Sequence, residues 1–256
     1  MVNVQGKYAL ITGASRGVGK QVALCMADLG CNLILHSREL SHTKELKAEL
    51  EKKGIKVFAV QAELSKADQV QAMLQEIDGI VPQVDIIFNN AAVMTKHCLD
   101  FWNVPAEDYR LSFEINVIAI VLICQHFGPK MIANGFGRIL NTTSGIRKEP
   151  ELAAYSASKA ALTKYVQDIA PKLEGTGVTM NLLDPGWLRT NMGGPNAPNA
   201  VESSIPGAVV PALLDNGISG CWFSAQDYTG MTVQAAVEKA KSVKNDLLCI
   251  PPEYLK

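Results

Sequence analysis

The chain has 256 residues, with 24 basic and 25 acidic side chains and a formal net charge of −1. At roughly 150 residues per domain, this length fits one large domain or two small ones. Hydrophobic residues make up 48% of the chain, enough for a substantial core, so disorder is excluded for most of the length. The balanced charge argues against a nucleic-acid binder, which needs a basic excess to neutralise phosphates.

No apolar run reaches the roughly 18 residues that span a bilayer. The nearest, 115–129, is interrupted by Asn116, Gln125 and His126, and residues 1–8 carry no apolar segment of the kind found in secretory signals. The cysteines are scattered without a C-x-x-C pair, and the histidines show no metal-ligand spacing. These features predict a cytoplasmic protein with reduced thiols, no membrane partner and no metal site.

Short β-branched runs alternate with longer helical patterns along the chain. Several strands, such as the one around 33–35, are apolar on both faces, as in a parallel sheet covered by helices on both sides. We therefore predict an α/β fold with one doubly wound parallel sheet of about seven strands. Strands are expected at 8–11, 32–36, 56–60, 84–88, 138–141, 178–183 and 221–224, and helices at 18–29, 41–53, 66–77, 106–127, 155–173 and 232–241.

The stretch 190–215 differs from the rest, because it is rich in Gly, Pro and Asn and lacks clear periodicity at its start. Loops of this length are often lids, so we expect a substrate lid, with a plain surface excursion as the alternative. Residues 231–256 are expected to form a C-terminal helix and tail. No linker divides the chain, so a single domain over 1–256 is predicted.

A glycine-rich turn joins the first predicted strand to the first predicted helix, with the sequence TGASRGVG at 12–19. Its glycines let the backbone approach a pyrophosphate, and the helix N-terminus behind them offers unpaired N–H groups. The spacing is G-x-x-x-G-x-G rather than the commoner G-x-G-x-x-G. Its position between strand and helix favours a Rossmann-type dinucleotide site over a glycine turn without a ligand.

The end of the second predicted strand indicates which dinucleotide is bound. An NAD-preferring site would place an acidic residue about twenty residues past the glycines, on the ribose 2′-hydroxyl. Arg38 stands in that region instead, and Arg16 lies within the glycine turn. Two guanidinium groups suit a 2′-phosphate, although both could also be solvated surface charges. We predict NADP(H) as the cofactor.

A tyrosine and a lysine open a later helix. Tyr155 and Lys159 are four residues apart, so both lie on one helix face, about one turn from each other. A nearby ammonium group lowers the pKa of a tyrosine toward the range useful for acid–base catalysis. Upstream, Asn141-Thr142-Thr143-Ser144 ends the fifth predicted strand and places hydroxyls at the carboxyl edge of the sheet, where ligands bind.

With these motifs in their order, the sequence resembles the short-chain dehydrogenase/reductase family in its compact form. The resemblance covers about three-quarters of the chain. It implies an NADP(H)-dependent, carbonyl-reductase-like oxidoreductase that interconverts a ketone or aldehyde and an alcohol by hydride transfer. The motifs are TGASRGVG at 12–19, NNAA at 89–92, Asn116, Ser144, YSASK at 155–159 and PGWLRT at 185–190.

The resemblance also implies roles for single residues. Tyr155 would be the general acid or base, Lys159 would lower its pKa, and Ser144 would bind the substrate carbonyl oxygen. Asn116 would complete a proton relay to solvent. The expected cofactor contacts are Gly13, Ser15, Arg16, Gly17, Val18, Gly19, Ser37, Arg38, Glu63, Leu64, Asn90, Ala91, Ala92, Tyr155, Lys159, Pro185, Gly186, Trp187 and Thr190, and the expected substrate contacts are Val93, Met94, Ile146, Arg147, Trp187 and Met192.

The chain departs from the family pattern at a few positions. Ala92 stands where the family usually has glycine, and Ser144 precedes Tyr155 by only 11 residues, which leaves Thr143 as an alternative substrate contact. The family's assembly implies a homodimer or homotetramer through the helices that hold Asn116 and Tyr155. The alternative function is a non-enzymatic NADP(H)-binding sensor or scaffold on the same fold.

Overall fold

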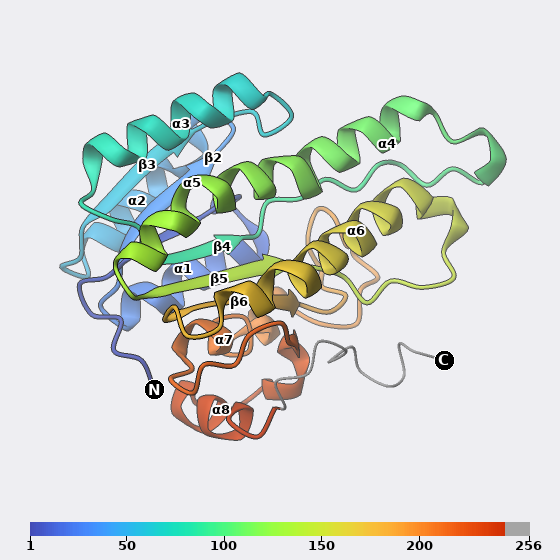
Figure 1. Ribbon diagram of the computed structural model, residues 1–256. Coiled ribbons are helices and arrows are strands. Elements are labelled where there is room, and N and C mark those ends of the chain that lie inside the picture. Colours follow the sequence, from blue (N-terminus) through green and yellow to red (C-terminus); the bar gives the residue numbers. More distant parts are fainter. Residues whose placement is uncertain (244–256) are drawn as a thin grey trace.

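The computed structural model describes residues 1–243, and Figure 1 shows a central sheet with helices on both faces. The sheet order is β3-β2-β1-β4-β5-β6-β7, and every neighbouring pair is parallel. The order reverses between β1 and β4, so the predicted doubly wound, Rossmann-like sheet is confirmed. The strands are β1 (Tyr8–Ile11), β2 (Asn32–Ser37), β3 (Val57–Gln61), β4 (Ile86–Asn89), β5 (Gly137–Thr142), β6 (Val178–Asp184) and β7 (Trp222–Ser224).

Two apolar clusters, one on each face of the sheet, form the core. Side chains of β1 alternate between them: Ala9 and Ile11 join one cluster, and Tyr8 and Leu10 the other. This explains why the strands are apolar at successive positions. The first cluster includes residues of α1 (Gly17–Asp28), α2 (Lys44–Glu51), α7 (Val210–Leu213) and α8 (Val233–Ala240), and the second those of α3 (Ala67–Ile80), α5 (Ala119–Ala133) and α6 (Ala153–Ile169).

Several helices differ from the sequence prediction at their ends. The helix expected at 41–53 begins with a 3-10 turn, Leu40–Thr43, and the one expected at 155–173 ends with a 3-10 turn, Ala170–Leu173, which contains Pro171. The helix expected to end at residue 127 continues through Pro129 to Ala133. Met131, one of the last residues of this helix, is buried, so the end of the helix is held by core packing.

The long helix expected at 106–127 is not uniform. It consists of α4 (Ala106–Phe113), a π-helical turn at Glu114–Ile118, and α5. By length and composition the run Ala106–Ala133 could cross a membrane, with a mean hydropathy of 1.6 over its most apolar window, 39% of which is buried. The run packs against α3, α6 and β5, as the core helix of a globular domain does, and a lone helix of this kind is weak support for a membrane span.

The stretch expected to be a lid, 190–215, divides into a surface segment and a segment that belongs to the core. Residues 208–214 are buried in the first core cluster, and α7 packs against α8. Only the part from 190 to about 203 lies mostly at the surface and can serve as a lid. The expected C-terminal helix is α8, whereas the tail expected after it, 244–256, lies outside the described residues.

Candidate active site at the carboxyl edge of the sheet

The glycine turn is held on the sheet edge by hydrogen bonds from the strand beside it. Thr12 Oγ1 accepts the backbone N–H groups of Asn90, at 2.9 Å, and Ala91, at 3.0 Å. The side chain of Asn90 donates to the carbonyl of Thr12 at 2.9 Å and to that of Gly13 at 3.3 Å. The segment after β4 therefore fixes the turn that the sequence assigns to the cofactor.

Two positions in the turn admit only glycine. Gly13 has φ +66°, and a Cβ atom there would lie 2.9 Å from the Cα of Ala91. A Cβ atom on Gly19 would lie 2.4 Å from the carbonyl oxygen of Gly13, which is a severe overlap. The turn thus carries no side chains at these two glycines and packs closely against its neighbours. A pyrophosphate site at the N-terminus of α1 requires backbone that is accessible in this way.

Sequence reasoning missed His36, which joins three segments beneath this turn. Its side chain is only 2% exposed, its Nδ1 accepts the N–H of Gly13 at 3.3 Å, and its Nε2 lies 3.1 Å from the carbonyl oxygen of Ala62. Burial lowers the pKa of His36 to about 4. The ring is therefore neutral, with Nε2 protonated. In the sequence His36 is merely one polar residue near the end of a buried strand, so only the fold reveals this role.

The residues expected around the adenosine end of the cofactor lie around the ends of β2 and β3. Arg16, the residue before α1, and Arg38, just after β2, are both exposed. The hydroxyl of Ser37 donates to the carbonyl of Glu39 at 2.7 Å. A carboxylate oxygen of Glu63 accepts the N–H of Ser65 at 3.2 Å. The two guanidinium groups are thus available at this end of the site.

Tyr155 and Lys159 lie side by side at the start of α6, as their spacing predicts. Both are buried, and Lys159 Nζ lies 5.8 Å from the centroid of the Tyr155 ring. Lys159 Nζ donates to the carbonyl of Thr142 at the end of β5, at 2.7 Å. Ser144 Oγ accepts the N–H of Ile146 at 3.3 Å, and the hydroxyl lies close enough to Tyr155 to lower its pKa. The structure therefore brings the predicted serine, tyrosine and lysine together.

Burial dominates the ionisation of this group. It lowers the pKa of Lys159 to about 7, because the ammonium form loses its hydration. It also raises the pKa of Tyr155, an effect that the nearby Ser144 hydroxyl opposes and the charge of Asp184 reinforces. The sequence argument expected a Tyr155 pKa lowered by Lys159. In the structure the pKa of Tyr155 is raised instead, because the effect of burial is larger than the opposing effect of the neighbouring groups.

The structure separates the two hydroxyls that the sequence left as alternatives. The side chain of Thr143 is buried and lies 3.1 Å from the hydroxyl of Thr163, whose own hydroxyl donates to the carbonyl of Lys159. Ser144 is partly exposed and faces Tyr155. Of the two, only Ser144 lies where a substrate oxygen could reach it together with the tyrosine.

Asn116 lies in the π-helical turn and is fully buried. Its side chain accepts the N–H of Val93 and donates to the carbonyl of the same residue, both at 2.9 Å. It also donates to Ser158 Oγ at 2.9 Å, and Ser158 donates to the carbonyl of Tyr155. Asn116 thus connects the segment after β4 to the helix that carries Tyr155.

The segment after β6 closes over the glycine turn. A Cβ atom on Gly17 would lie 3.8 Å from the methyl group of Thr190. Trp187 is 59% exposed, and its ring N–H donates to the carbonyl of Gly193 at 2.7 Å. Met192 beside it is also exposed. The segment therefore holds an apolar ring in a defined orientation near the edge of the site.

Two loops carry the other expected substrate contacts. Ala92, Val93 and Met94 follow β4, Ile146 and Arg147 follow β5, and all are partly exposed. The loops are joined beyond the site, where Cys98 N–H donates to the carbonyl of Glu151 at 3.0 Å. The methyl of Ala92, in place of the family's usual glycine, lies in this partly open region.

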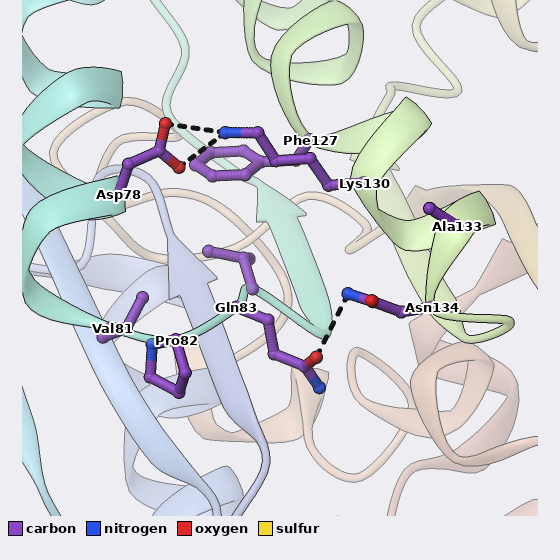
Figure 2. A pocket seen from close by; sticks show the side chains of 9 residues that line it. Asp78, Val81, Pro82, Gln83, Phe127, Lys130, Ala133 and Asn134 are labelled. Atoms are coloured by element: carbon purple, nitrogen blue, oxygen red, sulfur yellow. Dashed lines mark hydrogen bonds and ion pairs between the residues drawn. The ribbon is translucent and has the colours of Figure 1, made fainter.

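A separate hollow of about 300 Å³ lies at the opposite, amino-terminal edge of the sheet (Figure 2). Its polar side chains are paired with one another: Lys130 bonds to Asp78 at 2.6 Å, and Asn134 donates to Gln83 at 3.1 Å. The glycine turn and the group formed by Ser144, Tyr155 and Lys159 are both at the other edge. The candidate active site is therefore the carboxyl edge.

The fold and this site together define a dinucleotide-binding α/β oxidoreductase. A sequence model described as short chain dehydrogenase matches residues 7–200, so the chain belongs to the short-chain dehydrogenase/reductase family. A 3-oxoacyl-(acyl-carrier-protein) reductase of Synechocystis is 31% identical over 195 residues, which are 75% of this chain and 78% of that protein.

Solved structures show the same relationship. A metagenomic short-chain oxidoreductase in complex with NADP is 27% identical with a TM-score of 0.68, over 72% of this chain and 84% of that one. An NAD⁺-bound xylitol dehydrogenase is 25% identical with a TM-score of 0.68, over 74% of this chain and 73% of that one. Family members thus use either nicotinamide cofactor.

Proposed function

We propose that the protein is an NADP(H)-dependent reductase that interconverts a ketone or aldehyde and an alcohol. The observation that carries this proposal is the cluster at the carboxyl edge of the sheet, in which the Ser144 hydroxyl lies close to Tyr155 and the buried Lys159 Nζ lies 5.8 Å from the Tyr155 ring centroid. A sensor or scaffold without activity would have no need for an acid, a hydroxyl donor and an ammonium group so arranged. The small-molecule substrate would enter between the loops after β4, β5 and β6.

The residues present fit a dinucleotide. The bare glycine turn and the N-terminus of α1 would hold its pyrophosphate, and the Pro185–Gly186 turn would lie beneath its nicotinamide. When bound, the cofactor supplies or accepts a hydride. In the reduction, Ser144 binds the carbonyl oxygen and stabilises its developing charge, and Tyr155 donates the proton. Lys159 holds its ammonium group behind the tyrosine.

The first test is turnover of a panel of ketones, quinones and 3-oxoacyl thioesters with NADPH, followed by loss of cofactor absorbance. Tyr155→Phe removes only the acid, so we expect NADPH to bind while turnover falls by at least about a thousandfold. Tyr165→Phe, on the same helix but beside Cys124 and away from Ser144, is the control and should keep turnover. Near-normal turnover of Tyr155→Phe would refute the assigned acid. Binding of NADPH without any turnover by the wild type would favour the sensor.

The preference for NADP(H) is a separate part of the proposal. It is supported by the two exposed guanidinium groups of Arg16 and Arg38 and by the lack of an acidic residue at the end of β2. We expect NADPH to be used with a higher kcat/KM than NADH. Arg38→Ala should raise the KM for NADPH about tenfold or more and leave that for NADH nearly unchanged. A clear preference of the wild type for NADH would contradict it.

We further propose a homodimer or homotetramer, formed through α4, α5 and α6. Large apolar side chains on the α4–α5 run, among them Leu111, Ile118 and Ile132, are 39% to 41% exposed. Such a face is normally covered in a stable protein. A cytoplasmic location is proposed on the thiols of Cys31 and Cys124, which a reducing compartment keeps reduced.

A further inference from the structure

Ser158 is a fully buried serine on α6 whose hydroxyl takes part in two hydrogen bonds. It donates to the carbonyl of Tyr155 at 2.7 Å, within the same helix. It also accepts an N–H of the Asn116 side chain at 2.9 Å, from the π-helical turn between α4 and α5. A serine hydroxyl bonded to its own helix is common, so the bond from Asn116 is what distinguishes Ser158.

The side chain of Asn116 uses its oxygen and both of its N–H groups. Its Oδ1 accepts the N–H of Val93, and one N–H of Nδ2 donates to the carbonyl of the same residue, both at 2.9 Å. An amide nitrogen has a second N–H, and Ser158 Oγ accepts it. Because Asn116 is fully buried, bulk water does not replace this acceptor, and losing it leaves a buried donor without a partner.

These bonds form a chain between two parts of the site. One end is Val93, in the segment after β4 that is expected to contact the substrate, and the other is the backbone of Tyr155. The same segment is attached to the glycine turn by separate bonds, in which Thr12 Oγ1 accepts two backbone N–H groups. A change at Ser158 therefore acts on the alignment of the substrate loop with the tyrosine and leaves the cofactor turn in place.

We propose that Ser158 is a positioning residue that acts through Asn116 and keeps the loop after β4 aligned with Tyr155. The inference rests on the proposed function and adds a residue to it. Proton transfer to the substrate oxygen requires the tyrosine hydroxyl within hydrogen-bond reach, and a misplacement of about 1 Å costs up to about a hundredfold in rate. Because Ser158 is fully buried, it acts on the reaction through its hydrogen bonds.

The test compares Ser158→Ala with Ser156→Ala in the full-length protein. Ser156 lies two residues earlier on α6, and its hydroxyl donates to the carbonyl of Leu152 at 2.9 Å, so the same substitution there removes only a bond at the start of the helix. We expect Ser158→Ala to lower kcat for carbonyl reduction about tenfold, while the Kd for NADPH stays within about twofold. Ser156→Ala should keep both values within about twofold of the wild type.

A double-mutant cycle separates an action through Asn116 from a general loss of packing. Asn116→Ala removes the shared bond from its other side. Adding Ser158→Ala to Asn116→Ala should therefore lower kcat by no more than about twofold further. A wild-type kcat in Ser158→Ala overturns the inference, and so does a double variant in which the two single losses multiply.

A second variant keeps the test valid if Ser158→Ala does not fold, as judged by its melting temperature. Ser158→Cys retains a weak donor and a weak acceptor, so its kcat should lie below that of the wild type, and it takes the place of the alanine variant in the cycle. If the cycle fails while Tyr155→Phe is inactive, the inference is wrong and the proposed function stands. Full activity of Tyr155→Phe instead refutes the proposed function itself.

Discussion

His36 shows how a single buried side chain connects the cofactor turn to stability. Burial lowers its pKa from 6.5 to about 4. Between these values the unfolded chain binds a proton that the folded chain does not. The free energy of unfolding should therefore fall by about 3 kcal/mol as the pH drops from 6.5 to 4 through this residue alone.

This pH dependence can be isolated by comparing variants. His36→Gln has no group that titrates in this range, so its loss of stability toward acid pH should be smaller than that of the wild type by about that amount. Urea unfolding at neutral pH and near pH 4.5 measures it. His42→Gln, at an exposed histidine, should behave as the wild type does. Equal acid sensitivity of the His36 variant and the wild type would rule out the assigned role.

Among single residues, sequence reasoning succeeds where the chemistry is local. Tyr155 and Lys159 are one helical turn apart, so their spacing alone places them together. His36 is different, because its partner, Gly13, is brought to it only by the fold. No periodicity or spacing distinguishes His36 from any other polar residue near the end of a buried strand.

Helix α1 depends on glycine at a position where alanine would usually be better. In most helix interiors Gly→Ala is stabilising. At Gly19, however, the Cβ atom would lie 2.4 Å from the carbonyl oxygen of Gly13 and 2.6 Å from Asn90 Nδ2. We expect Gly19→Ala to destabilise the protein by about 1–3 kcal/mol and to weaken NADPH binding, since the turn must move. Thermal unfolding and a cofactor titration would show both effects.

Gly79 provides the matched control, because it lies in α3 with no atom within 4 Å of a Cβ built there. Gly79→Ala should leave NADPH binding unchanged and raise stability by about 0.5 kcal/mol. If both alanine variants behaved alike, the close packing of α1 on the glycine turn would not be what requires Gly19.

At the scale of elements, the period of the hydrophobic pattern predicts which segments are helices and which are strands. It does not predict where an α-helix is interrupted by a π-helical turn. The π-helical turn at Glu114–Ile118 contains Asn116, whose side chain is bonded to Val93, far away in the sequence. Likewise α7 becomes part of the core because β7 and α8 are present to cover it. Both features are consequences of tertiary packing, which composition cannot reveal.

At the scale of the whole molecule, the alternation of strands and helices leads to the architecture almost directly. Connections between parallel strands are right-handed in nearly all proteins, so strands that follow one another with intervening helices build outward from β1 in two directions. The two core clusters then need helices on both faces. This reasoning does not account for the apolar outer side of the α4–α5 run, which we propose a second copy covers.

The proposed assembly makes this outer side testable. Ile118 and Ile132 are fourteen residues apart, close to four helical turns, so they lie on nearly the same side of the run. Each is 41% exposed, and α4 with the start of α6 extends beyond the sheet in Figure 1. If a second copy covers this side, Ile118→Arg places a charge in the interface and should convert the protein to a monomer. Leu40→Arg, at a residue 46% exposed beside β2 and β3, should keep the assembly of the wild type. Analytical ultracentrifugation distinguishes these outcomes, and a wild type that sediments as a monomer would mean that this surface has no partner copy.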